Sequence, residues 1–409
     1  MPEKVTQNKK NAAIICELNP LHKGHEALFR QVKQRAEGLV CVMSGNFVQR
    51  GEPAILDKWA RCRLALEAGA DLVLELPLPW ACAGAERFAA GGVHLLSALG
   101  TVDYLAFGSE FPWQEQLSRI AQALLSEDFS RALAALPDHG EPFAQRREQA
   151  LIALLGEDIL PLLRSPNAIL GIEYEKALLR EQSSIQPLVF PRVGAGHDKA
   201  AADDENRSAG ELRELLRAGK ALDGLVPDYT VGPLAEEIKA GRCPADTALL
   251  ERAILCKLRT MTLPEFAALP DVSEGLEHRL LAAAGKSGTL EEFLALVKSK
   301  RYSHARLRRL VLYAFLGVTK DLPALPPYLR VLGMTDSGER LLKKASPALP
   351  IAARAADFQR LGGDALRLFQ LEAAADDLYA LMTPVPVPCG RDYTEKLIKE
   401  HLSRGASPK

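Results

Sequence analysis

The first 110 residues alternate between short apolar runs and amphipathic stretches, and this alternation restricts the fold more than any other feature. The apolar runs are AAIICEL (12–18), LVCVMS (39–44), DLVLELP (71–77) and DYLAFGSE (103–110). Helical candidates lie between them at 24–37, 57–69 and 83–98. Strands that alternate with helices form a parallel sheet with right-handed crossovers. We therefore expect an α/β fold that binds its ligand at the carboxyl ends of the strands.

The rest of the chain is mainly helical in pattern. Residues 113–182 read as helices, a further strand is expected at 185–190, and a short helix near 208–218. After about residue 222 helical segments dominate, with one strand candidate at 327–334. We predict a disordered lead-in over residues 1–10, a Rossmann-like catalytic domain with a parallel sheet over 11–225, and a mostly helical C-terminal domain over 226–409.

Composition excludes several classes of protein. The formal net charge of −1 argues against a chain that binds nucleic acid through its overall charge, although a local basic face is compatible with it. The seven cysteines are odd in number and include no C-x-x-C pair, so we expect reduced thiols in the cytoplasm. The polar N-terminus lacks a signal peptide, and no run of about 18 uncharged apolar residues predicts a membrane span.

The segment NPLHKGHEAL (19–28) places His22 and His25 where the first strand should give way to a helix. A helix N-terminus exposes unpaired N–H groups and a partial positive charge, which suits phosphate. Gly24 would let the backbone approach a ligand, and both imidazoles can donate to phosphate oxygens as pyrophosphate leaves. On the residues alone, a turn histidine and a surface histidine explain the motif equally well. Metal binding is a weaker interpretation, because no third ligand stands at a recognised spacing.

The strand, the H-x-G-H motif and the following helix resemble the nucleotidyltransferase superfamily that binds ATP through this signature. Further segments resemble the tRNA(Met) cytidine acetate ligase family within it, and together they span most of the chain. These segments are residues 17–28, 42–77, 107–110, 165–174, 192–199 and 298–317.

The resemblance implies a two-step reaction. Members of this family activate acetate with ATP, giving acetyl-adenylate and pyrophosphate, and do not use acetyl-CoA. The exocyclic amine of the wobble cytidine of elongator tRNA(Met) then attacks the acetyl carbonyl, giving N4-acetylcytidine. We expect Mg²⁺ to act through the phosphates of ATP, because magnesium is usually coordinated by phosphate oxygens and water rather than by protein ligands alone. No protein partner can be inferred.

Carried over position by position, the resemblance makes His22 and His25 catalytic and assigns a set of ATP-binding residues. That set is Ile15, Cys16, Glu17, Leu18, Asn19, Pro20, Leu21, His22, Lys23, Gly24, His25, Glu26, Ala27, Leu28, Gly108, Asn167, Arg192 and Val193. Ser208 and Arg213 are further phosphate candidates, although Gly210 and Leu212 depart from the superfamily's Ser-rich pattern ending in Ile-Arg. His197 stands where the family pattern has an aromatic residue.

Two stretches are candidates for the RNA and acetate. Between 298 and 309 six basic residues occur without an acid, with Tyr302 and His304 among them: Lys298, Lys300, Arg301, Arg306, Arg308 and Arg309. We favour RNA binding, with donors from Arg301 and Arg308 and a stacking ring from Tyr302, over a solvated helix face. After the second strand, Ser44, Asn46, Arg50 and Lys58 are placed to meet cytosine, acetate or RNA phosphate, unless this stretch is an ordered loop that shapes the sheet edge.

Two other functions stay open on the sequence. The H-x-G-H motif alone would also suit an adenylyltransferase for a small cofactor precursor. A nucleotide- or RNA-binding protein without catalysis is the other alternative. The long C-terminal half and its basic segment favour a macromolecular substrate.

Overall fold

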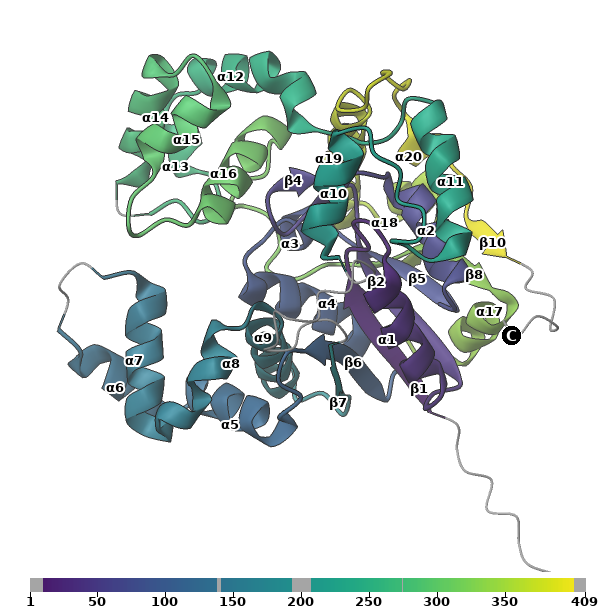
Figure 1. Cartoon of the computed structure of the whole chain (residues 1–409), viewed down its shortest axis with the longest axis horizontal. Coiled ribbons are helices and arrows are strands. Elements are labelled where there is room, and N and C mark those ends of the chain that lie inside the picture. The colour runs from purple at the N-terminus through teal and green to yellow at the C-terminus, as the bar shows by residue number, and fades with distance from the viewer. Residues whose placement is uncertain (1–9, 138–140, 193–206, 274, 401–409) are drawn as a thin grey trace, which may run out of the picture.

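The computed structural model describes residues 10–137, 141–192, 207–273 and 275–400 (Figure 1). The strands are β1 (Asn11–Cys16), β2 (Gly38–Ser44), β3 (Phe47–Val48), β4 (Glu52–Pro53), β5 (Leu72–Leu76), β6 (Tyr104–Ser109), β7 (Gln186–Pro191), β8 (Leu329–Thr335), β9 (Ile351–Ala352) and β10 (Ile398–Glu400). Up to residue 217 the α-helices are α1 (Lys23–Lys33), α2 (Lys58–Glu67), α3 (Leu78–Ala81), α4 (Ala85–Leu99), α5 (Gln114–Leu124), α6 (Glu127–Ala135), α7 (Phe143–Leu155), α8 (Leu160–Arg164), α9 (Pro166–Arg180) and α10 (Ala209–Arg217). The later ones are α11 (Asp228–Lys239), α12 (Glu251–Thr260), α13 (Leu263–Ala267), α14 (Leu276–Lys286), α15 (Leu290–Val297), α16 (His304–Leu316), α17 (Asp336–Lys344), α18 (Ala355–Leu361), α19 (Gly363–Tyr379) and α20 (Arg391–Thr394). Short 3₁₀ turns occupy Glu157–Ile159 and Thr247–Leu250.

The main sheet has the strand order β10-β8-β5-β2-β1-β6-β7, with β9 beside β8. Its neighbours are parallel except for β5 and β8, which are antiparallel. From central β1 the chain passes through β2 to β5, and then crosses back to β6 and β7 on the other side of β1. Such a reversal opens a crevice at the carboxyl ends of the strands, here between β1 and β6. The expected parallel α/β sheet is confirmed.

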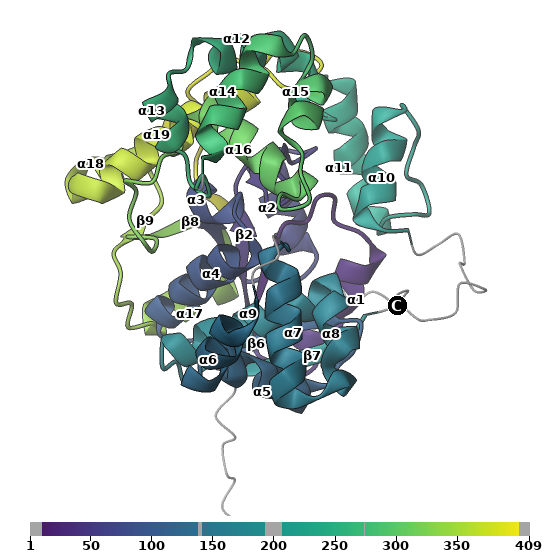
Figure 2. The ribbon, with the colours of Figure 1, turned by 90° about the vertical axis from the view of Figure 1, so that its left-hand side faces the viewer.

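The alternation of side chains along the strands gives the sheet two apolar faces. Ala13 and Ile15 of β1 pack into the layer that contains α4 and α9. The intervening Ala12 and Ile14 pack into the layer of α1 and α2, against residues such as Phe29. Figure 2 shows α4 and α9 on the near face of the sheet. Because both faces are covered, the strands read as continuous apolar runs, as the sequence predicted.

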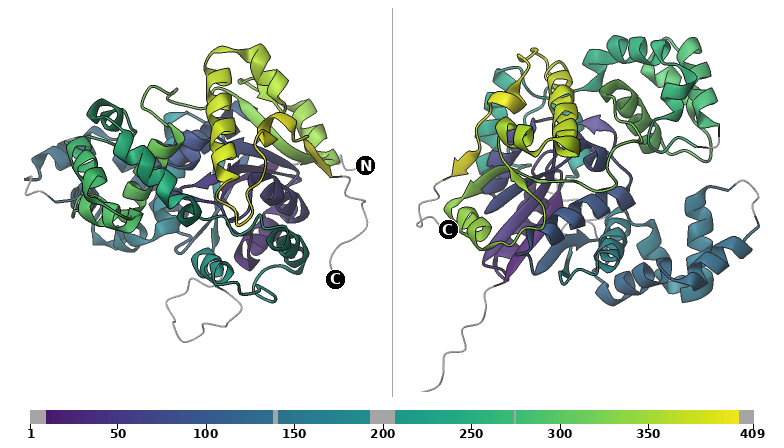
Figure 3. Two further views of the ribbon diagram at one scale, coloured as in Figure 1. Left: turned by 90° about the horizontal axis from the view of Figure 1, so that it is seen from above. Right: turned by 180° about the vertical axis from the view of Figure 1, so that it is seen from behind.

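A third apolar cluster holds α12 to α16 together beside the sheet, where Figure 3 shows them as a group of green helices. Phe266, Phe293 and Leu310 are buried in it. Phe47 of β3 and Leu78 of α3 belong to the same cluster, so the short hairpin β3–β4 joins these helices to the sheet. We call α12–α16 the helical cluster.

Strands from beyond the expected boundary at residue 225 complete the sheet. β8 lies between β5 and β10, and confirms the strand predicted at 327–334. The boundary therefore does not divide a sheet from a helical half, because the chain returns to the sheet after the helical cluster. The assignment of 11–225 as a catalytic domain stays a prediction, and residues 1–9 of the expected lead-in lie outside the described residues. In the described ranges, none of the helices has the length and apolar content needed to cross a bilayer.

Candidate active site

A pocket of about 600 Å³ lies where the strand order reverses. The segments that line it follow β1, β6 and β7, together with the N-terminal turns of α1, α9 and α10. This volume lies within the usual range for small-molecule sites. The pocket brings together most of the predicted ATP-binding residues: Ile15, Cys16, Glu17, Leu18, Asn19, His22, Lys23, Gly24, His25, Ala27, Leu28, Gly108, Asn167 and Arg192.

The two histidines of the H-x-G-H motif form the cap of α1. His22 is the N-cap, and its Nδ1 accepts the backbone N–H groups of Gly24 at 3.0 Å and His25 at 3.4 Å. In return, Nδ1 of His25 accepts the N–H of His22 at 3.3 Å. The rings stack with their centroids 3.8 Å apart. Since each Nδ1 acts as an acceptor, the neutral rings carry their protons on Nε2 and keep one N–H donor each.

Both imidazoles are neutral in the ligand-free protein. Burial and the nearby Arg192 guanidinium lower the pKa of His22 to about 4. Burial, then His22 and Arg192, lower the pKa of His25 well below 6.5. A polyphosphate at this site would counter the charge of Arg192 and favour protonation, so the pair can donate to phosphate in either state.

Two glycines in the pocket make room for neighbouring side chains. A Cβ added to Gly24 would lie 2.9 Å from Cε1 of His22, so this glycine makes room for the capping ring. A Cβ added to Gly108 would lie 3.1 Å from Cγ of Arg192. Gly108 therefore lets the Arg192 side chain cross the end of β6.

Asn167 is held by a carboxylate that sequence reasoning did not single out. Glu110 accepts the side-chain amide of Asn167 at 2.5 Å and the N–H of Ala168 at 3.1 Å. It thus caps α9 in place of Ser165, whose hydroxyl donates to the carbonyl of Pro161. The sequence held a signal for this residue, because Glu110 is the last residue of the strand predicted at 103–110.

The phosphate candidates at α10 also line the pocket. Ser208 is the N-cap of α10, and its hydroxyl donates to Glu211 at 2.7 Å. Arg213 donates from Nη1 to the carbonyl of Asn19 at 2.8 Å and pairs through Nε with Glu52 at 3.1 Å. Arg213 therefore braces the cis Asn19–Pro20 turn. The predicted contact at Val193 and the position of His197 lie outside the described residues.

Three residues of the predicted ATP-binding stretch do not line the pocket: Pro20, Leu21 and Glu26. Leu21 is buried in the apolar layer beneath α1 and α2. Glu26 pairs with Arg30 one turn along α1, at 3.5 Å.

Lys58 lies in a buried ion cluster and not in the pocket. Its side chain is 0% exposed, and Nζ lies 2.9 Å from Glu75 and 2.8 Å from Asp392. Arg330 of β8 contacts the same two carboxylates, each at 2.9 Å. We define the ion cluster as Lys58, Glu75, Arg330, Glu372, Asp376 and Asp392. The expected contact of Lys58 with acetate or RNA is incompatible with this burial, because none of its surface meets solvent.

Charge balance in the ion cluster follows from proton uptake. Burial and the carboxylate of Glu75 raise the pKa of Glu372, and burial and Asp392 raise the pKa of Asp376. Burial acts in the same direction on Asp392, but Arg330 and Lys58 outweigh it and lower the pKa of this carboxyl. Burial thus favours the protonated forms of Glu372 and Asp376, while Arg330 and Lys58 favour the ionised form of Asp392.

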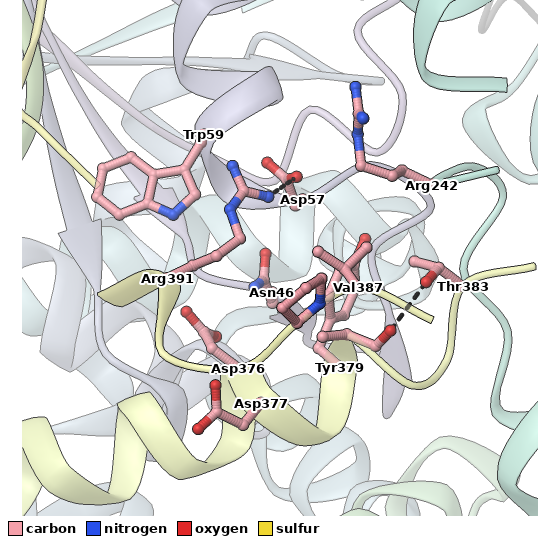
Figure 4. Close-up of a pocket in the computed structure, with 12 residues that line it drawn as sticks. Asn46, Asp57, Trp59, Arg242, Asp376, Asp377, Tyr379, Thr383, Val387 and Arg391 are labelled. Carbon is pink, nitrogen blue, oxygen red and sulfur yellow. Dashed lines mark hydrogen bonds and ion pairs between the residues drawn. The ribbon is translucent and has the colours of Figure 1, made fainter. Parts of the chain in front are cut away.

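Ser44 and Asn46 also lie away from the pocket. Ser44 is fully buried, and its carbonyl accepts Arg61 at 2.9 Å. Asn46 accepts the N–H of Lys58 at 2.6 Å and lines the small cavity beside the ion cluster shown in Figure 4. Arg50, by contrast, is exposed at the tip of the β3–β4 hairpin and does line the pocket.

The side chains of the basic segment differ in their exposure. Lys300, Arg301 and Arg308 are exposed. Lys298 donates to the carbonyl of Tyr302 at 2.6 Å, and Arg309 donates to the carbonyl of Gln49 at 3.1 Å.

Tyr302 does not offer the stacking ring that we expected. It is 9% exposed, and the Arg306 guanidinium lies 4.9 Å from the centre of its ring. Arg306 also donates to the carbonyl of Asp271 at 2.5 Å. Lys300 and Arg301 line an open groove of about 400 Å³ next to this pair, together with Arg279.

In the part of the chain that the structure describes, no three His, Cys, Asp or Glu side chains are grouped so that they could hold a metal ion. Glu110, the carboxylate beside Asn167, is occupied by the N-terminus of α9.

Known proteins resemble this chain in sequence and in fold. Residues 9–392 match the pattern of the HIGH Nucleotidyl Transferase family. A tRNA(Met) cytidine acetate ligase of Caldanaerobacter subterraneus subsp. tengcongensis is 40% identical over 380 residues, which are 90% of this chain and 94% of that protein. One from Acetivibrio thermocellus is 38% identical over 412 residues, covering 95% and 99%. The crystal structure of Thermotoga maritima TmcAL bound with alpha-thio ATP is 31% identical, with a TM-score of 0.88, and covers 96% of this chain and 100% of that one.

A family pattern over most of the chain and relatives matched along nearly their whole length establish the assignment. The protein belongs to the HIGH nucleotidyltransferase family and, within it, to the tRNA(Met) cytidine acetate ligase family.

Proposed function

We propose that the protein activates acetate with ATP as acetyl-adenylate and transfers the acetyl group to the wobble cytidine of elongator tRNA(Met). One observation carries this proposal: the capped histidine pair, Gly108, Asn167 and Arg192 converge on one pocket in a chain of this family. Free thiols at all seven cysteines suit a reducing cytoplasm.

The phosphates of ATP would lie at the N-terminus of α1. Backbone N–H groups and the positive end of the helix favour anions there. The Nε2–H groups of His22 and His25 supply two donors, and Arg192, close enough to depress the pKa values of both rings, supplies a cation. These groups would stabilise the charge that develops as pyrophosphate leaves.

The nucleoside would lie toward α9. Asn167 is fixed in the first turn of this helix by Glu110, so its amide is oriented before the ligand arrives. The aromatic ring of Phe107 and the end of β7 form the adjoining wall. Magnesium would be held by phosphate oxygens and water, and would screen the phosphate charge.

The tRNA would approach from the helical cluster. Lys300, Arg301 and Arg308 present exposed cations there, and Arg50 continues the basic surface to the mouth of the pocket. Contacts of this kind give affinity that falls with salt. The loop around the anticodon would be read as single-stranded RNA, whose bases can be turned outward.

An acetylation assay tests the proposal. The protein is incubated with ATP, Mg²⁺, labelled acetate and bulk tRNA, and the label in cytidine is measured. We expect label with acetate and ATP, and no dependence on acetyl-CoA. Label that appears only with acetyl-CoA contradicts the proposal. Pyrophosphate release that depends on neither acetate nor tRNA would instead indicate an adenylyltransferase for a small molecule. A lack of ATP binding would indicate a binding protein without catalysis.

Two sets of variants separate the two steps. His22→Ala and His25→Ala should each reduce acetate-dependent ATP–pyrophosphate exchange more than tRNA binding. Charge reversal at Arg301 and Arg308 should reduce tRNA binding more than exchange. Arg309 is left out of this set because it also supports the hairpin. If the histidine variants and the arginine variants reduce the same step equally, the assignment of the histidines to adenylate formation and of the arginines to tRNA binding is wrong.

A further inference from the structure

The carboxylate of Glu17 lines the pocket on the side of the β3–β4 hairpin. Its Oε1 accepts the backbone N–H of Gln49 at 2.8 Å. The carbonyl of the same Gln49 accepts Nη1 of Arg309, from the basic helix α16, at 3.1 Å. One residue of the hairpin thus separates Glu17 from the helix that we propose to face RNA. Glu17 lies on the path between the tRNA surface and the histidine pair.

Two buried donors lining the same pocket have no hydrogen-bond partner among the described residues. They are the hydroxyl of Tyr174 and the side-chain nitrogen of Asn19. Tyr174 is 1% exposed and Asn19 is 2% exposed. Tyr174 interacts electrostatically with Glu17, and Asn19 already uses its side-chain oxygen to accept the N–H of Ile55. Buried polar groups in proteins are nearly always paired, so these donors indicate a polar ligand.

An acceptor and two donors from residues that line one pocket match the Watson–Crick edge of cytosine. That edge presents the N4 amine as a donor, and N3 and O2 as acceptors. We propose that Glu17 binds the exocyclic amine of the target cytosine and takes its proton during acetyl transfer, while Tyr174 and Asn19 donate to N3 and O2. This inference rests on the proposed function. Uracil would place a carbonyl oxygen against the carboxylate, so the same contact discriminates against it.

The proton balance of the step is complete. The N4 lone pair forms a bond to the acetyl carbonyl carbon of acetyl-adenylate, and the bond from that carbon to the phosphate oxygen breaks. AMP leaves with the electron pair, and the N4 proton passes to the Glu17 carboxylate. An exocyclic amine conjugated with its ring is a weak nucleophile, so a base at this position accelerates the step.

The surroundings of Glu17 suit a base. Burial raises the pKa of its carboxyl, the N–H of Gln49 and the Arg213 guanidinium act against this, and Glu52 adds to it. Arg61 lies on the same side and donates to the backbone carbonyl of Glu17 at 2.7 Å. A carboxylate of raised pKa holds the transferred proton better than a solvated one does.

The variant Glu17→Gln tests the inference. Its side-chain oxygen can still accept from Gln49, but it has no basic oxygen. We expect acetyl transfer to cytidine to fall about 100-fold or more, the usual effect of losing a general base. Because Glu17 also lies in the predicted ATP-binding stretch, acetate-dependent ATP–pyrophosphate exchange is measured in the same variant, and it should fall at least about tenfold less than acetyl transfer does. Glu214→Gln is the matched control, because it removes the same charge from an exposed position on α10 outside the pocket.

Two further measurements complete the test. The wild-type transfer rate should rise with pH through the pKa of Glu17, and this rise should be absent in Glu17→Gln. Tyr174→Phe, which keeps the ring packed near Phe107, should raise the KM for tRNA and reduce the difference in binding affinity between tRNAs with cytidine and with uridine at the target position.

The outcomes are distinct. Equal loss of exchange and transfer in Glu17→Gln would place Glu17 in adenylate formation and overturn the inference. Unchanged transfer would overturn it as well. A wild-type protein without acetate-dependent exchange would instead refute the proposed function.

Discussion

Removing the amino group of Lys58 should destabilise the whole fold, because this side chain neutralises carboxylates from distant parts of the chain. Lys58 is 0% exposed and contacts Glu75 of β5 and Asp392 of α20. In Lys58→Met one of these two buried negative charges loses its balancing cation, since only Arg330 remains between them. Removing one partner of a buried ion pair lowers the free energy of unfolding by about 3–5 kcal/mol. That is a large part of the stability of a typical protein.

The measurement is the free energy of unfolding in urea. Arg50→Met is the matched control, because it removes a cation from an exposed position in the same stretch and should change stability by no more than about 0.5 kcal/mol. Adding Glu75→Gln to Lys58→Met removes the stranded charge and should restore at least half of the loss. Our account of the cluster is wrong if Lys58→Met lowers the free energy of unfolding by less than about 1 kcal/mol. It is also wrong if adding Glu75→Gln lowers that free energy further.

The remaining predictions concern the pocket and the hairpin. His22→Asn keeps a side-chain acceptor for the cap of α1, so it should unfold within about 1 kcal/mol of the wild type while ATP–pyrophosphate exchange falls at least about tenfold. Because the pKa of His22 is lowered to about 4, the ligand-free protein should lose stability in urea as pH falls from about 6.5 to about 4; His22→Asn should flatten this dependence. Arg308→Ala should reduce the slope of log affinity for tRNA against log salt by about 1, as measured by filter binding. Gly51→Ala should cost at least about 1 kcal/mol, since Gly51 has a φ of +75° and an added Cβ would lie 2.5 Å from the backbone nitrogen of Arg309.

The sequence predicted the parts of the site that depend on local pattern. His22, Gly108 and Arg192 each lie at or just after the end of a predicted buried strand, and parallel strands bring their carboxyl ends to one edge. For this reason the convergence of these residues could be predicted without coordinates. A role for Glu110 could have been predicted on the same grounds, because it is the last residue of a predicted strand.

Residues that depend on distant partners could not be predicted. Lys58 stands at the start of the predicted helix 57–69, and its partner Asp392 is more than three hundred residues away in the chain. Nothing near Lys58 signals burial. Tyr302 looked like a stacking ring because it lies among arginines, but one of those arginines covers it. β9 and β10 are too short to show an alternating pattern.

The position of β8 has a consequence for synthesis on the ribosome. β5 ends at residue 76, yet its outer neighbour β8 begins only at residue 329. Until that segment emerges, the growing chain carries a half-built sheet with an open edge of unpaired N–H and C=O groups, which invites aggregation. The helices that lie between β5 and β8 in the chain can form earlier, because their contacts are local. Nascent chains that stop before residue 329 should therefore need chaperone protection, whereas in the finished chain β8 covers the edge of β5.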